Sequence, residues 1–138
     1  MKESRDRASM TCAFIYYARL IGARGSVSYS DMYRRIFGAF EGNRQLANDI
    51  WAAHETRLFL EITDERDTLK ALNEIYLKPF ARSPRRIAAK NEISLRVLRF
   101  AQDNHLDERT VYRRLSKARR LWSKIRQYGN IQKNKELL

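Results

Sequence analysis

Basic and hydroxyl side chains gather in one short stretch, "LDERTVYRRLSKARRLW", which runs from Leu106 to Trp122. An arginine guanidinium can make two hydrogen bonds to the edge of a guanine, and lysine and threonine can bond bases or phosphates. These side chains could therefore contact base edges, provided that one element presents them together. The candidates for base contacts are Arg109, Thr110, Arg113, Arg114 and Lys117.

An apolar stripe predicts which side of this stretch faces away from the protein. Val111, Leu115, Ala118 and Trp122 recur at steps of four, three and four residues, which is the spacing of one buried helix face. The five candidates lie wholly or partly off that face, near the start of the predicted helix. The stretch therefore predicts an amphipathic helix whose outward side is basic.

The residues before this helix match the other parts of a helix-turn-helix, in which a small residue on the first helix lets the second cross closely. A helix is predicted from Ile93 to Asp103, and Ala101 is its small residue. Leu106 is the apolar residue that fixes the turn, and Asp107 is placed to cap the second helix. The order of these parts predicts a DNA-reading helix.

Further basic residues are predicted to position the DNA backbone, since phosphate contacts fix register without reading sequence. Arg119 and Arg126 come late in the helix and are either backbone contacts or solvated charges. Tyr112 either contacts a phosphate through its hydroxyl or packs against the protein. The candidates for phosphate contacts are Arg85, Arg86, Lys90, Tyr112, Arg120 and Lys124.

The charge of the chain is uneven. Its 138 residues include 28 basic and 16 acidic side chains, for a net charge of +12. Residues 1–62 hold nine basic and seven acidic residues, whereas residues 63–138 hold nineteen and nine. A basic half joined to a nearly neutral half indicates a surface for a polyanion such as double-stranded DNA.

Helical spacing also dominates the rest of the chain, and no convincing strand is present. Ser30 is predicted to cap a short helix, and Thr63 or Asp64 to open another. A long apolar stripe, predicted to be core, includes Trp51, Phe59 and Ile62. The predicted fold is all-α: a helical lobe over residues 1–62, able to contact a protein, then a helix-turn-helix lobe over 63–127 and a flexible tail over 128–138.

The segment "FAQDNHLDERTVYRRLSKA" resembles the helix-turn-helix of sigma factor region four and of related response-regulator output domains. Those share an alanine in the first helix, an apolar turn residue and a pattern like "DERTVYRRL". His105 stands where their turn commonly has glycine, and Asn104 where an apolar residue is usual. Because asparagine tolerates a left-handed backbone, the turn is expected to be shifted or longer.

The wider arrangement resembles the late-gene antitermination Q proteins of lambdoid phages, through a helical lobe, the break "YLKPF" and the terminal motif. The resemblance implies a protein of the bacterial cytoplasm that binds DNA near a late promoter. It further implies contact with RNA polymerase and its sigma factor, and suppression of pausing and termination. Some Q proteins carry a zinc-binding cysteine cluster, which this chain cannot form because Cys12 is its one cysteine.

Little in the sequence favours an enzyme, a metal site or a cofactor. The two histidines, His54 and His105, lie far apart, and we expect the first to be a partly buried structural residue and the second to lie in a turn. Asp64, Glu65 and Asp67 begin a predicted helix, where its dipole favours acids. We therefore expect no catalytic residue, no bound metal and no cofactor.

The sequence also lacks an apolar run long enough to span a bilayer or to act as a secretory signal, so no membrane contact is expected. Two alternatives to transcription regulation stay open. One is a module for DNA packaging or a replication origin that never touches polymerase. The other is a nuclease or recombinase built on the acidic residues at 64, 65 and 67. The sequence does not predict the oligomeric state.

Overall fold

The computed structural model describes the backbone of residues 2–21, 28–78 and 86–136, and the side chains of residues 9–21, 28–78 and 90–128. Within these ranges the chain forms six α-helices and no strand, which confirms the predicted all-α fold. The helices are α1 (Lys2–Ile21), α2 (Tyr29–Ala39), α3 (Arg44–Ile62), α4 (Arg66–Ile75), α5 (Arg86–Asp103) and α6 (Glu108–Glu136).

Helices α2 and α3 each begin after an N-cap residue whose side chain bonds a free backbone N–H group of the first turn. The hydroxyl of Ser28 accepts the Asp31 N–H at 3.2 Å, and the amide oxygen of Asn43 accepts the Leu46 N–H at 3.1 Å. The prediction of Ser30 as the first cap is wrong by two residues, because the extended backbone lies at Ser28.

A left-handed residue joins α3 to α4. Asp64 has φ 57°, and the N–H groups of Asp64 and Glu65 bond back to the carbonyls of Glu61 and Leu60, at 3.2 and 3.0 Å. This pair of bonds is a Schellman motif, which ends a helix by turning the chain away from its axis. Helix α4 therefore begins only at Arg66, later than the predicted start at Thr63 or Asp64.

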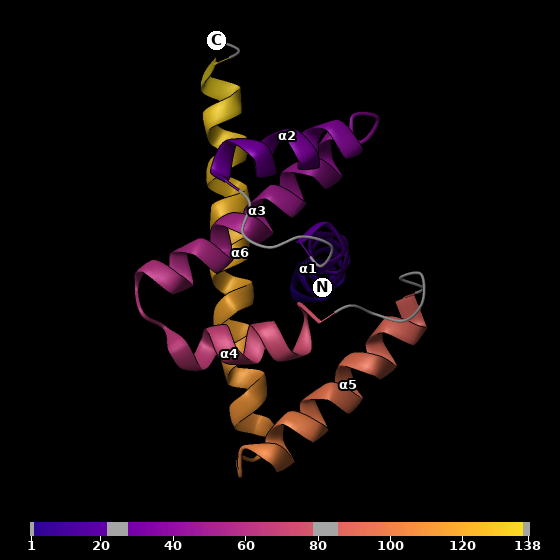
Figure 1. The fold of residues 1–138 in the computed structure, drawn as a ribbon. Coiled ribbons are helices and arrows are strands. Elements are labelled where there is room, and N and C mark those ends of the chain that lie inside the picture. Colours follow the sequence, from indigo (N-terminus) through magenta and orange to yellow (C-terminus); the bar gives the residue numbers. More distant parts are fainter. Residues whose placement is uncertain (1, 22–27, 79–85, 137–138) are drawn as a thin grey trace.

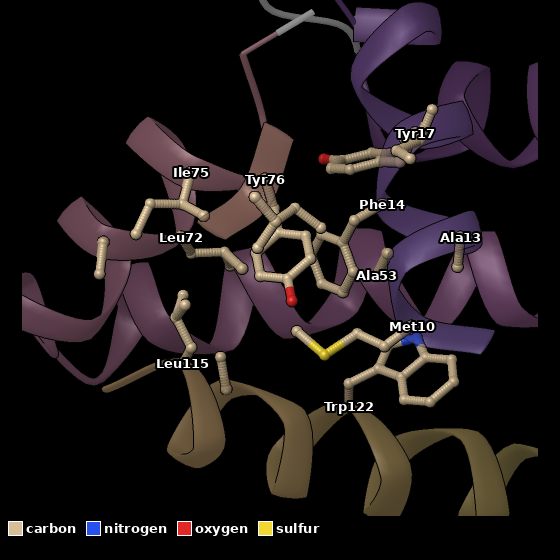
Figure 2. Packing of buried hydrophobic residues seen from close by; sticks show 14 of the residues in the cluster. Met10, Ala13, Phe14, Tyr17, Ala53, Leu72, Ile75, Tyr76, Leu115 and Trp122 are labelled. Atoms are coloured by element: carbon tan, nitrogen blue, oxygen red, sulfur yellow. The ribbon is translucent and has the colours of Figure 1, made fainter. Parts of the chain in front are cut away.

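The core forms where four helices meet. Figure 2 shows side chains of α1, α3, α4 and α6 converging, among them Phe14, Leu72, Leu115 and Trp122. Trp122 is fully buried, and its indole N–H donates to the backbone carbonyl of Asp49 at 3.0 Å. This bond satisfies the polar atom of the large side chain, so its whole ring can pack in the interior.

Helix α6 runs the length of the structure, past α4 and α3, with α5 folded back against its start (Figure 1). It continues to Glu136, so the segment predicted as a tail from residue 128 is helical to that residue. Side chains of α1 and α3 share one buried cluster with those of α4, α5 and α6. The core is therefore continuous across the predicted lobe boundary at residues 62 and 63, and the lobe division stays a prediction.

Candidate nucleic-acid interface

The corner between α5 and α6 is closed by backbone hydrogen bonds. The N–H groups of Leu106 and His105 bond the carbonyls of Ala101 and Gln102, at 2.9 and 3.4 Å. His105 has φ 55°, so it takes the left-handed conformation at the position where the resembling motifs have glycine. The left-handed residue is therefore not Asn104, and a four-residue connection is sufficient to turn the chain.

Polar side chains tie this corner to its neighbours. The Asn104 amide donates to the Phe100 carbonyl at 2.8 Å and accepts a bond from the Lys70 ammonium of α4, also at 2.8 Å. The Asp107 carboxylate accepts the Thr110 N–H at 2.7 Å and so caps α6 as predicted. That hydrogen bond, helped by the nearby Arg113 and Arg109, holds the pKa of Asp107 below its usual value.

The predicted buried face of α6 is confirmed. Val111, Ala118 and Trp122 are fully enclosed, and Leu115 is 6% exposed. Because the helix turns by about 100° per residue, this stripe determines the direction of every other side chain on α6. Positions on the opposite side of the helix are turned away from the core and toward solvent.

Four basic residues occupy that opposite side. Arg109, Arg113, Arg120 and Lys124 are all exposed, and helical geometry places them within about 60° of one another around the axis. We call these four residues the outward stripe. From Arg109 to Lys124 it extends for about 22 Å at the ordinary helical rise. Four positive charges therefore line the solvent side of α6.

The other predicted base contacts lie on the flank of α6 that faces α4. Thr110 is half-buried, and so is Arg114, which lies 4.0 Å from the Asp67 carboxylate. Lys117 is exposed but pairs with Glu65 at 2.8 Å. The structure therefore separates the five candidates: Arg109 and Arg113 on the outward stripe, and the remaining three on its flank.

The predicted phosphate contacts also divide. Lys90 and Tyr112 are exposed, as are Arg120 and Lys124. Arg85 lies outside the described residues, and Arg86 opens α5 but its side chain is not described. Arg126 is directed inward: its guanidinium pairs with Asp49 at 3.4 Å and lies 5.0 Å from the centre of the Trp122 ring. The prediction that Arg126 is a backbone contact or a solvated charge is therefore wrong.

An exposed aromatic cluster on α2 and α3 was not predicted. Tyr29 and Tyr33 are 55% and 48% exposed, and their rings lie 4.7 and 5.1 Å from that of the half-buried Trp51. Phe59 and Ile62, expected in the core, are also exposed. Helical spacing indicated which residues share a side of α3. It could not show that α2 covers only part of that side.

The ionisable groups singled out for an enzyme have structural partners. Asp64 pairs with Arg66 at 2.7 Å, in addition to the pairs that Glu65 and Asp67 make with α6. Buried His54 bonds the Tyr17 hydroxyl through Nδ1 at 2.7 Å, and burial lowers its pKa to about 4. The acidic triplet is thus engaged in ion pairs, two of which join α4 to α6.

The described residues contain no group of three histidine, cysteine or carboxylate side chains arranged to hold a metal ion. Among the described helices, none has both the length and the apolar composition required to cross a membrane.

Comparisons with protein-family models, with curated proteins and with solved structures give no match to this chain.

Proposed function

We propose that this protein binds double-stranded DNA in a sequence-specific manner through a helix-turn-helix made of α4, α5 and α6. The outward stripe of α6 is the observation that carries the proposal. It places basic side chains on the solvent side of a helix whose start is held by two others, α4 and α5. This is the arrangement by which a recognition helix enters the major groove with its first turns.

The dimensions of DNA assign roles along the stripe. The major groove is about 12 Å wide, and the first eight residues after Arg109 cover about 12 Å of helix axis. Arg109 and Arg113 lie within that length and are the proposed base-reading residues. Arg120 and Lys124 lie beyond it, where the strands that border the groove carry phosphates, and they are the proposed backbone contacts.

The charge distribution supports the same assignment. Residues 63–138 hold nineteen basic and nine acidic side chains, whereas residues 1–62 are nearly balanced. A duplex attracts such a surface, because each phosphate contact releases condensed counterions into solution. On this proposal the protein is a binding protein and not an enzyme, and the ion pairs of Asp64, Glu65 and Asp67 account for the acids that suggested a nuclease.

Selection of bound duplexes from a random pool tests the proposal. The full chain should enrich a common sequence. Its affinity for a random duplex should fall with salt with a logarithmic slope of about −0.9 for each phosphate contacted. The affinity for the selected duplex should exceed that for the random one by a factor of about 1,000 or more. Enrichment of no sequence, with equal affinity for both duplexes, would refute specific recognition.

The resemblance to antitermination proteins supports a narrower proposal, that the DNA-bound protein engages RNA polymerase and suppresses termination. The exposed rings of Tyr29 and Tyr33 on α2 favour a protein contact, since tyrosine is enriched where proteins meet. Polymerase holoenzyme on the selected site should retain the protein in a pull-down. A protein that binds the selected DNA but is not retained by polymerase would favour the packaging or origin-binding alternative.

A further inference from the structure

The start of α4 lies beside the flank of α6 and brings two carboxylates to two of its cations. Glu65 accepts a hydrogen bond from the Lys117 ammonium at 2.8 Å, and Asp67 lies 4.0 Å from the Arg114 guanidinium. In each pair at least one of the two side chains is exposed to solvent. A phosphate approaching this flank would therefore meet cations that already have anionic partners.

Glu65 stands at the start of α4, where the helix dipole favours an acid, but its carboxylate also contacts α6. Glu65 is the N-cap residue of α4, yet its side chain makes no capping hydrogen bond. The left-handed turn at Asp64 presents it beside α6, where it accepts a hydrogen bond from Lys117, 52 residues later in the chain. The carboxylate therefore contacts α6 in addition to standing at the start of α4.

We infer that Glu65, with Asp67 beside it, limits sequence-independent DNA binding by competing with phosphates for Lys117 and Arg114. The inference rests on the proposed function, because Lys117 and Arg114 lie on the flank of α6 beside the outward stripe. Non-specific affinity depends on the number of cations free to neutralise phosphates. A carboxylate bonded to one of those cations must be displaced before a phosphate can use it, whatever the sequence of the duplex.

Glu65→Gln is the principal test, measured as the affinity of the full chain for a random duplex over a range of salt concentrations. The change retains the shape of the side chain and removes its charge. An exposed ion pair of this kind is worth a factor of roughly two to five, so affinity should rise by about that factor. The slope of log affinity against log salt should steepen by about 0.9, for one additional phosphate contact.

Glu74→Gln is the matched control. Glu74 also lies on α4 and pairs with Lys78, and its replacement changes the net charge by the same amount. If the effect arises from the contact with α6 and not from net charge, Glu74→Gln should leave the slope unchanged. Asp67→Asn should act in the same direction as Glu65→Gln, but more weakly, because its pair is longer.

The role of Lys117 can be isolated in a second background. In a Lys117→Ala chain, the effect of Glu65→Gln on the salt slope should largely disappear. Equal slopes for Glu65→Gln and Glu74→Gln in the unaltered background would overturn the inference and leave the proposed function standing. If the unaltered chain and every variant fail to bind duplex DNA, the proposed function fails, and the inference fails with it.

Discussion

Two buried ionisable residues on α3 respond to burial in opposite directions. Asp49 is 7% exposed, and burial raises its pKa to about 6 although the Arg126 guanidinium lowers it. His54 is 6% exposed, and burial lowers its pKa to about 4, with a further lowering from Arg57. In both cases the interior disfavours the charged form.

Their effects on stability should oppose each other below neutral pH. The pKa of Asp49 is raised from 3.8. Its contribution to the free energy of unfolding is therefore present in acid and is lost as pH rises from about 4 to 6. The pKa of His54 is lowered from 6.5, so its contribution is present above that pH and is lost as pH falls toward 4. Each is worth on the order of 3 kcal/mol.

Single substitutions should therefore tilt the pH profile in opposite directions. As pH falls from 6 to 4, the free energy of unfolding of Asp49→Asn should decrease relative to that of the unaltered chain. That of His54→Gln should increase relative to it over the same range. Urea unfolding at a series of pH values measures both slopes. Profiles parallel to that of the unaltered chain would show that these two groups do not titrate with the shifts described.

At the scale of single residues, the sequence predicted the burial and exposure that depend on helix periodicity alone. The burial of Val111 and the exposure of Arg113 follow from a single stripe on α6. The pairs of Asp49 with Arg126 and of Glu65 with Lys117 join residues far apart in the chain. No local pattern indicates such partners, because they depend on how whole helices cross.

The elements of this protein are joined at two corners by left-handed residues that are not glycine. Asp64 ends α3 and His105 follows α5, each with φ between 55° and 57°. A side chain in this conformation brings its Cβ close to the following carbonyl. The α5–α6 corner is retained because its backbone bonds and the Lys70–Asn104 contact hold it from several sides.

Replacing His105 should show this strain directly. His105→Gly should stabilise the protein by about 0.5–1 kcal/mol, because glycine adopts the left-handed region without a steric cost. His105→Val should destabilise it by about 1–2 kcal/mol, since a β-branched side chain suits that region poorly. Thermal unfolding gives the comparison.

Asp103→Gly is the control for the corner, since Asp103 is the last residue of α5. Glycine in a helical conformation should lower stability by about 0.5–1 kcal/mol. A stabilising effect of glycine at both positions, or at neither, would contradict the role assigned to His105.

The sequence predicted that the helices form. It predicted less well where they end and which of their faces are covered by neighbouring helices. The caps at Ser28 and Glu65 lie within a few residues of the predicted ones, and they differ because the backbone conformation selects the capping residue. Phe59 and Ile62 follow the periodicity of a buried face yet are exposed. Burial depends on which neighbour covers a face, and periodicity does not contain that information.

At the scale of the whole molecule, α6 is the helix that contacts α1, α3, α4 and α5. Its first part passes α5 and α4 (Figure 1). Farther on, the Trp122 indole N–H donates to a backbone carbonyl of α3. The surface proposed to bind DNA is therefore the outer side of a helix whose inner side contributes to the common core. A rigid core under the outward stripe would hold its arginines in fixed register, as base contacts require.

This arrangement predicts one cooperative unfolding transition. Helical circular dichroism and tryptophan fluorescence should change at the same temperature, because Trp122 belongs to the continuous core and Trp51 packs against it. A fragment of residues 63–138 should fail to fold, since it would expose Trp122, whose burial is worth about 3–5 kcal/mol. Two separate transitions, or a fragment that melts as the full chain does, would show that the lobes are independent.

The outward stripe of α6 is proposed to read DNA, and paired arginine substitutions on two faces of the protein test this claim. The test variant combines Arg109→Gln with Arg113→Gln. The control combines Arg34→Gln with Arg44→Gln on α2 and α3, where both side chains are exposed, for the same change in net charge. The measurement is the affinity of each full chain for the selected duplex.

The α6 variant should lose roughly 30-fold or more in affinity, since each bidentate contact with a base is worth about 1–3 kcal/mol. The control should lose only the small part that arises from lower net charge. Equal losses for the two variants would contradict the claim, because they would show that the duplex responds to the charge of the protein and not to the face that carries it.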